Sequence, residues 1–179
     1  MRESYVCISA VTEGEQKYIR PMKPSGHHFK EDEIREYHLH PFNLIAFEYS
    51  ETQPQLVSPH HEDCYVKSWR YIRSFTMPEI NDLLHGISKR SLWNLFGCKP
   101  IFGRAYSLEE PPACSLGTII PQTIWEIEFK PHPKNEGKSD FRINFQDHSR
   151  KSYSGIPIVD LRFRHLLEEA RNRGVSYEE

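Results

Sequence analysis

The N-terminal residues predict a strand–turn–strand unit, and this unit limits the folds open to the chain. Val6, Ile8 and Ala10 alternate with more polar neighbours, which is the period-2 pattern of a half-buried strand. Gly14 lies in the expected turn, and Pro21 is expected to end the second strand because it cannot donate to a β-ladder. A hairpin followed by many short strands favours a small barrel over a sheet with crossover helices. Small barrels of this kind usually act as binding surfaces.

Composition restricts the possible partners. The chain has 179 residues and a formal net charge of −2, so nucleic-acid binding would need a local basic patch. No apolar run approaches the roughly 20 residues that span a bilayer. The cysteines are widely spaced, which fits reduced thiols and a cytoplasmic protein. They are Cys7, Cys64, Cys98 and Cys114.

Periodicity and capping residues predict the remaining elements. Short strands are expected at 44–47, 55–57, 63–66, 67–75, 115–120, 123–130 and 140–146. A helical turn is expected at 32–37, with helices from Thr76 to Gly86, from Ser91 to Gly97 and from Asp160 to Gly174. Residues 99–112 are expected to connect elements, and residues 131–138 to form a hairpin loop.

These elements predict a mostly-β protein with a few helices, of the α+β class. Residues 1–75 are expected to form a first small barrel and residues 76–98 a helical connection. Residues 99–179 are expected to form a second barrel with a C-terminal helix.

The strand at 67–75 is the first candidate for a ligand surface. Its period-2 pattern places Lys67, Trp69, Tyr71, Arg73 and Phe75 on one face. Aromatic rings stack on bases and cations neutralise phosphates, so this face would suit single-stranded nucleic acid. The alternative is that the rings form core, with the aliphatic stems of the cations lying along them.

Basic residues of the first hairpin extend this candidate site. Arg20 and Lys17, with Lys23 nearby, could add positive charge to the same patch. The alternative is that they are ordinary solvated charges.

Histidines raise the question of a metal site. The chain has 10 histidines. Several precede Cys64: His27, His28, His38, His40, His60 and His61. Their spacing fits no standard zinc template, so we expect loop histidines, with neither metal nor cofactor.

A nuclease is the enzymatic alternative. Glu126, Glu128 and Lys130 resemble part of a site in which carboxylates hold Mg²⁺. However, Trp125, Ile127 and Phe129 alternate with them, so the charged residues also fit the wet face of an amphipathic strand. The sequence predicts no catalytic residue.

Several short motifs follow one another in a characteristic order along the chain: Tyr18–Pro21, Leu44–Phe47, His60–Cys64, Ser115–Gly117, Phe141–Phe145, Tyr153 and Val159–Asp160. This order resembles the dual OB domain family of prokaryotic proteins. The resemblance implies that residues 1–75 and 99–179 are two OB-like barrels. It also implies a non-catalytic module that binds nucleic acid in a defence or mobile-element system. The family pattern continues with strands that close the second barrel, whereas this sequence ends in a helix. We therefore expect that barrel to be left open, or to be filled by the helix or a partner.

Two functions follow as hypotheses. The first is recognition of RNA or single-stranded DNA through Lys17, Arg20 and the 67–75 strand. The second is an adaptor role, in which the open barrel docks on a larger effector protein. The negative net charge of the chain favours the adaptor role, whereas the family resemblance favours nucleic-acid recognition.

Overall fold

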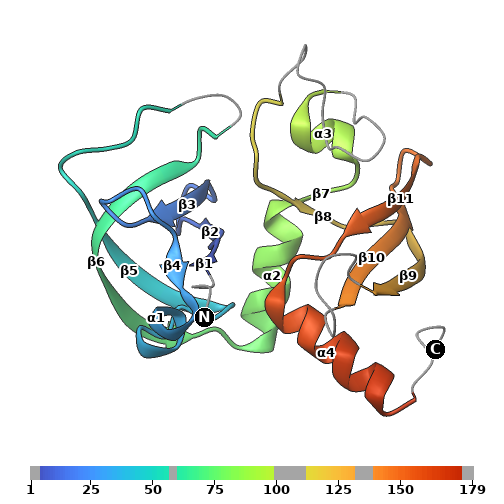
Figure 1. Ribbon diagram of the computed structural model, residues 1–179. Helices are drawn as coiled ribbons and strands as arrows, with labels where there is room; N and C mark the ends of the chain where they lie inside the picture. Colours follow the sequence, from blue (N-terminus) through green and yellow to red (C-terminus); the bar gives the residue numbers. More distant parts are fainter. Residues whose placement is uncertain (1–4, 57–59, 99–111, 132–138, 175–179) are drawn as a thin grey trace. The chain divides into compact units, whose positions relative to one another are not determined.

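A computed structural model describes residues 5–56, 60–98, 112–131 and 139–174 of the protein (Figure 1). Within these ranges it is a mixed α+β protein with four helices and several sheets, which confirms the α+β class. The chain divides into two compact units. Unit 1 is Met1–Ser88 with Pro111–Thr118, and unit 2 is Lys89–Glu110 with Ile119–Glu179. No helix in the described ranges has both the length and the apolar character needed to cross a bilayer.

Unit 1 is built on a four-stranded sheet. Its order is β2 (Ala10–Val11), β3 (Tyr18–Met22), β6 (Asp63–Ser74) and β5 (Asn43–Tyr49). The β3–β6 pair is parallel and the other two pairs are antiparallel. A separate pair joins β1 (Tyr5–Val6) to β4 (Phe29–Lys30), and α1 (Glu31–Glu36) follows β4.

The N-terminal hairpin forms, but it is shorter than predicted. Ala10 pairs with Ile19, whereas Tyr5–Val6 leaves the hairpin and pairs with β4. The prediction that Pro21 ends its strand is wrong. Pro21 pairs with Cys64 in the parallel ladder, and its missing N–H falls beyond the end of the β2 pairing, where no donor is needed.

The core of unit 1 combines apolar side chains of its strands with those of the segments around α1. Phe29 and Val66 are fully buried, and Leu39 comes from the connection after α1. Half-buried residues pack against this cluster: Ile8, Ala10, Ile34, Tyr37, Ile45, Phe47 and Trp69. The strands therefore pack against residues that precede and follow α1.

The helix predicted from Thr76 is present as α2 (Met77–Ile87). Thr76 and Glu79 form its capping box, as predicted. The prediction that Gly86 ends the helix is wrong, because Gly86 is its penultimate residue. A β-carbon there would lie 3.2 Å from the Gln16 side chain, so close packing and not chain reversal accounts for this glycine. The helix groups with unit 1.

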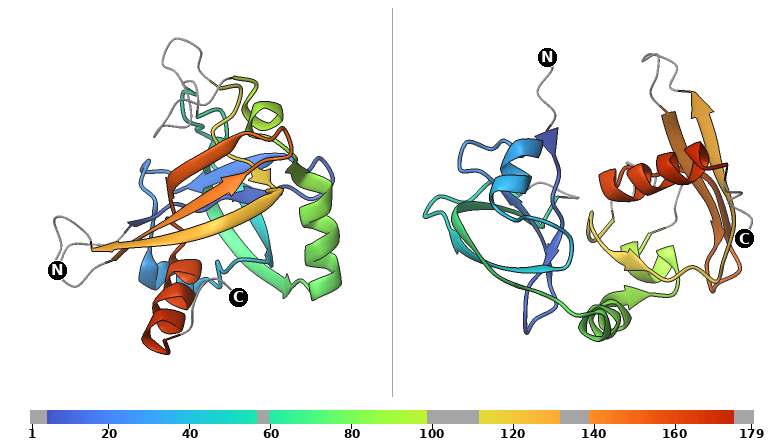
Figure 2. Two further views of the ribbon diagram at one scale, coloured as in Figure 1. Left: turned by 90° about the vertical axis from the view of Figure 1, so that its right-hand side faces the viewer. Right: turned by 90° about the horizontal axis from the view of Figure 1, so that it is seen from below.

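Unit 2 contains an antiparallel sheet and two helices. The sheet order is β11 (Ser152–Pro157), β10 (Ser139–Gln146) and β9 (Thr123–Pro131) (Figure 2). The helices are α3 (Leu92–Phe96) and α4 (Leu161–Asn172), and they confirm the helices predicted after Ser91 and Asp160. Phe141 is 1 % exposed and packs on Phe129, whose ring also contacts Arg171 of α4 at 3.7 Å.

Several other predicted elements differ from those in the structure, and some lie outside the described residues. The strand expected at 115–120 is only β8 (Thr118–Ile119), and β7 (Ser88–Lys89) was not predicted. The strands expected at 63–66 and 67–75 are one strand, β6. Most of 99–112, the loop at 132–138 and Val57 lie outside the described residues.

Candidate nucleic-acid interface

The residues predicted on one face of β6 do not share one face. Glu48 pairs with Ser68 and Tyr49 with Val66, so Lys67 is an extra residue in a bulge. A second register shift between Leu44 and Ile45 leaves Ile72 as another extra residue. Each bulge reverses the alternation of side chains, so a period of two cannot be extended along the whole strand.

The aromatic residues of this strand have separate surroundings. Trp69 packs edge-on against the rings of Phe29 and Tyr37, each at a centroid distance of 4.9 Å. Tyr71 is 41 % exposed, and its ring lies 5.4 Å from that of His38. Trp69 is thus part of the core of unit 1, which was the alternative interpretation of the stripe.

The cations of β6 are paired with carboxylates. Lys67 Nζ lies 2.7 Å from Glu48, and the Arg73 guanidinium donates to both carboxylate oxygens of Glu79 at 3.0 and 2.7 Å. The hydrogen bond from Arg73, with those from the Thr76 backbone and hydroxyl, lowers the pKa of Glu79 to about 2. A phosphate would have to compete with these anions.

Arg20 is held inside unit 1. Its guanidinium donates to Asp63 at 2.8 Å, to His60 Nδ1 at 2.9 Å and to Ser115 Oγ at 2.8 Å. The buried Glu62 accepts from the Ser115 backbone at 2.6 Å and hydroxyl at 2.8 Å. Burial raises the pKa of Glu62, but the hydrogen bonds from Ser115 and from backbone N–H groups that include that of Leu116 together outweigh burial and leave the pKa lowered. Arg20 therefore fastens Ser115 to the first sheet.

Lys17 is exposed and lines a cavity of about 330 Å³ in unit 1. Tyr49 and Leu56 contribute apolar surface to this cavity, while Glu62 and Asp63 contribute carboxylates. The structure does not bring Lys17 together with Lys67 or Arg73 in this lining. The mixed charge makes the cavity a weak candidate for an anionic ligand.

The acidic strand of the nuclease alternative has internal partners. Asn144 Nδ2 donates to Glu126 at 2.7 Å and to Glu128 at 2.8 Å, and Lys130 pairs with Glu128. In the described residues, no three His, Cys, Asp or Glu side chains are grouped to hold a metal ion. The predicted inward face also fails at Trp125, which forms a bulge and is 46 % exposed.

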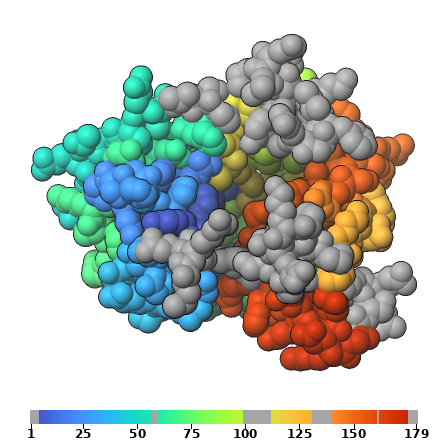
Figure 3. All heavy atoms as spheres, in the orientation of Figure 1, coloured from blue at the N-terminus to red at the C-terminus, as the bar shows by residue number. Residues whose placement is uncertain are grey.

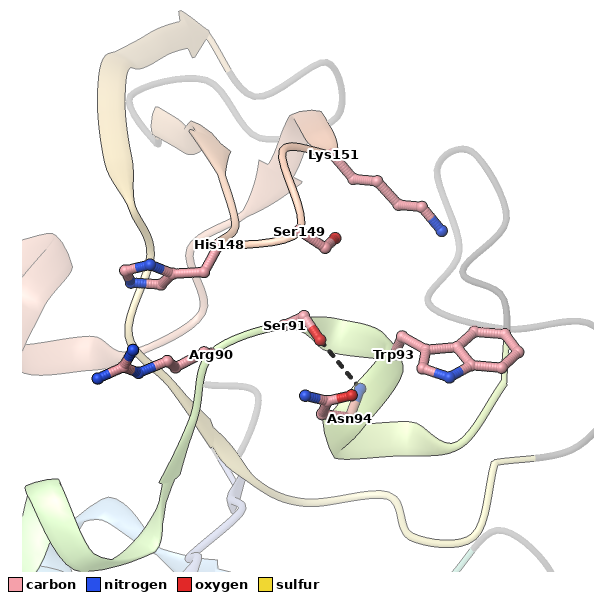
Figure 4. Close-up of a pocket in the computed structure, with 7 residues that line it drawn as sticks. All are labelled: Arg90, Ser91, Trp93, Asn94, His148, Ser149 and Lys151. Atoms are coloured by element: carbon pink, nitrogen blue, oxygen red, sulfur yellow. Dashed lines mark hydrogen bonds between the residues drawn. The ribbon is translucent and has the colours of Figure 1, made fainter.

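A second cavity, in unit 2, differs from the first because the lining that the structure describes contains basic and neutral polar side chains but no carboxylate. It measures about 290 Å³ and is lined by Arg90, Ser91, Trp93, Asn94, His148, Ser149 and Lys151. Figure 4 shows Arg90 and His148 at one end, Trp93 and Lys151 at the other, and the small polar side chains between them. Lys151 Nζ lies 5.9 Å from the centroid of the Trp93 ring, which is 49 % exposed.

The two cations of this cavity have no anionic partner among the described residues. There the side chains of Arg90 and Lys151 form neither an ion pair nor a hydrogen bond, and Lys151 Nζ contacts the Trp93 ring. This contrasts with Arg20, Lys67 and Arg73 in unit 1. Unneutralised cations beside an exposed indole are what a single-stranded nucleic acid binds.

Asp147 holds the two walls of the cavity together. Its carboxylate is fully buried and accepts from the Leu92 backbone at 3.2 Å, the Lys151 backbone at 3.3 Å and Tyr153 Oη at 3.1 Å. It also accepts from the Ser149 backbone and hydroxyl, at 2.9 and 2.6 Å. Burial raises the pKa of Asp147, but these hydrogen bonds outweigh it and leave the pKa below its usual value. One carboxylate therefore orients both the turn at 147–151 and the start of α3.

Helix α3 itself is defined locally. Ser91 Oγ accepts from the Asn94 backbone at 3.1 Å, and Gly97 ends the helix with φ +68°. The sequence predicted a helix from Ser91 that ends at Gly97, but it did not single out the cavity residues Arg90, Trp93, His148 and Lys151. Two signals were present in the sequence, a tryptophan next to the start of this helix and the basic turn His148–Lys151, but they lie far apart in the chain.

The sequence matches no family model, and searches of curated proteins and of solved structures found no significant match. The contacts within this chain therefore carry the functional proposal.

Proposed function

We propose that the protein is a non-catalytic module that binds single-stranded nucleic acid through the cavity of unit 2. The observation that carries this proposal is the exposed Trp93 ring beside Lys151, with Arg90 at the other end of the same cavity and neither cation paired with a carboxylate of the described residues. Base stacking on an aromatic ring contributes about 1–3 kcal/mol per base, and cations supply the salt-dependent attraction to phosphates. The 67–75 strand, proposed from the sequence, contributes less because its cations are paired.

The fold proposal supports the same function. We propose that both units are OB-like, as the resemblance to the dual OB domain family implies. In unit 1 the order β2-β3-β6-β5 and the helix between β4 and β5 support this proposal. OB-folds are partly open barrels that bind oligonucleotides. A role in a prokaryotic defence or mobile-element system rests on the resemblance alone.

A salt titration tests the proposal. The affinity for a fluorescent 12-nucleotide strand should fall with salt, with a log–log slope of about −1.4 if Arg90 and Lys151 each neutralise one phosphate. Lys151→Gln should reduce the magnitude of the slope by about 0.7. Arg162→Gln on α4 is the matched control, since Arg162 is exposed but lies outside the cavity, and it should leave the slope unchanged.

The stacking contribution has its own control. Trp93→Ala should weaken binding by about 5- to 150-fold, which corresponds to the loss of one stacked base. Trp125→Ala removes a ring of similar exposure from β9 and should change affinity less than twofold. Equal losses in the two variants, or no binding of the wild-type protein at low salt, would contradict the proposed function.

The adaptor role remains the second candidate because of one surface of unit 2. Phe163 and Leu166 of α4 are 40 and 60 % exposed, and Val159 just before the helix is 76 % exposed. Figure 3 shows α4 at the surface. Exposed apolar residues at helical spacing are typical of protein contacts. This candidate gains support if oligonucleotides do not bind at low salt.

A further inference from the structure

The cavity of unit 2 has a polar centre between two charged ends. Ser91, Asn94 and Ser149 lie between the Arg90–His148 end and the Lys151–Trp93 end (Figure 4). A single terminal phosphate would need only one cationic end. Cations at both ends fit a nucleotide that carries a phosphate on each side, which is a nucleotide inside a strand.

The cavity is large enough for a single nucleotide. Its volume of about 290 Å³ is at the lower end of the range for ligand pockets, which is roughly 300–1,000 Å³. It can therefore accommodate one unstacked nucleotide. Single-stranded recognition commonly places such a base against an aromatic ring and reads its polar edge.

Asn94 is the group that can read a base edge. Its backbone N–H donates to Ser91 Oγ, but its side-chain amide has no hydrogen-bond partner in the described residues. An amide offers a donor beside an acceptor and so matches a base edge with the same pair. Adenine has this pair on both edges, N6–H with N1 and N6–H with N7, and asparagine is its usual bidentate partner. Guanine matches the amide on its Watson–Crick edge, where N1–H lies beside O6, but presents only acceptors on its N7 edge. The pyrimidines match it on their Watson–Crick edge alone and offer a smaller stacking surface. Adenine therefore has more ways to pair with Asn94 while it stacks on Trp93.

We infer that the cavity binds one internal adenine nucleotide of a single strand, with the base on Trp93 and its polar edge on the Asn94 amide. This inference rests on the proposed function, because it names the ligand of the same site. Its flanking phosphates lie at the Arg90–His148 end and beside Lys151. These contacts involve the base and the phosphates, which RNA and DNA have in common, so either nucleic acid fits the cavity.

A set of 9-nucleotide strands that differ at one central position tests the inference. We measure fluorescence anisotropy with U4AU4, U4CU4, U4GU4 and U9, with the deoxy versions of each strand, and with U8A, whose adenine lacks a 3′ phosphate. The wild-type protein should bind U4AU4 at least fivefold more tightly than U9 and U4CU4, and more tightly than U4GU4 and U8A. The deoxy strands decide whether the natural source is RNA or DNA.

Variants separate base reading from general affinity. Asn94→Ala should bring the ratio of the affinities for U4AU4 and U9 close to one, and Asn94→Gln should restore part of this preference. Asn172→Ala, at an exposed position of α4, is the control and should keep the full preference. Equal affinity of the wild-type protein for all central bases would overturn the inference and leave the proposed function standing. No binding of any strand would overturn both.

Discussion

The strongest stability prediction concerns Asp147→Asn in unit 2. Asparagine keeps one acceptor oxygen but places an N–H₂ group where the second carboxylate oxygen accepts from Leu92 and Tyr153. The Leu92 N–H then loses its partner, which costs about 1–3 kcal/mol. The remaining bonds change from charged to neutral, with a loss of about 1 kcal/mol each for the backbone and hydroxyl of Ser149. We therefore expect unit 2 to lose about 3–5 kcal/mol of unfolding free energy.

Urea denaturation followed by tryptophan fluorescence measures this loss. The chain has 3 tryptophans, and replacing Trp69 by Phe leaves only Trp93 and Trp125, both in unit 2. Asp160→Asn is the matched control, because Asp160 caps α4 through the Phe163 N–H and asparagine caps equally well. It should change stability by less than about 0.5 kcal/mol.

The pH dependence provides an independent check. The folded pKa of Asp147 lies below its usual value of 3.8, so the unfolded state binds the proton more readily. This contribution is present above pH 4 and is lost as pH falls through the folded pKa. The Asp147→Asn protein should lack this part of the acid sensitivity. A loss below about 1 kcal/mol at pH 7, or an unchanged acid profile, would refute the role assigned to Asp147.

Three further predictions concern single residues. Trp69→Ala should destabilise unit 1 by about 3 kcal/mol in thermal unfolding, because it removes a ring packed on Phe29; a cost below 1 kcal/mol would remove Trp69 from the core. The Glu79 carboxyl should titrate near pH 2 by NMR, and in Arg73→Gln its pKa should rise toward 4.5; an unchanged value would exclude Arg73 as the main cause. Gly97→Ala should cost unit 2 about 1 kcal/mol in urea denaturation, since its φ of +68° disfavours a β-carbon, and a neutral effect would argue against this C-cap.

Local signals predicted the helices well. The capping residues Thr76, Ser91 and Asp160 lie at the starts of α2, α3 and α4, because a cap satisfies backbone donors within a few residues of itself. Gly97 ended its helix as predicted, whereas Gly86 did not. Glycine permits a helix to end, but at position 86 it lies inside the helix, where a β-carbon would come within 3.2 Å of the Gln16 side chain.

The sequence predicted less well which side chains share one face of a strand, because bulges shift the pairing register between neighbouring strands. Lys67 and Trp69 were expected on one face, but a bulge at Lys67 separates them. The same error occurred at Trp125, where another bulge turns the expected inward ring outward. A bulge depends on the partner strand, so periodicity within one strand cannot reveal it.

The sequence by itself determined the α+β character, the helix caps and the short strands, since these depend on residues near one another in the chain. Only the tertiary structure decided which charges remain available. Arg20 is occupied by Asp63 and Ser115, whereas Arg90 and Lys151 come from separate segments and have no carboxylate partner within the part of the chain that the structure describes. Whether a charged side chain can bind a ligand depends on the opposite charges that folding brings next to it. Neighbours that are distant in the chain cannot be recognised from the local sequence pattern.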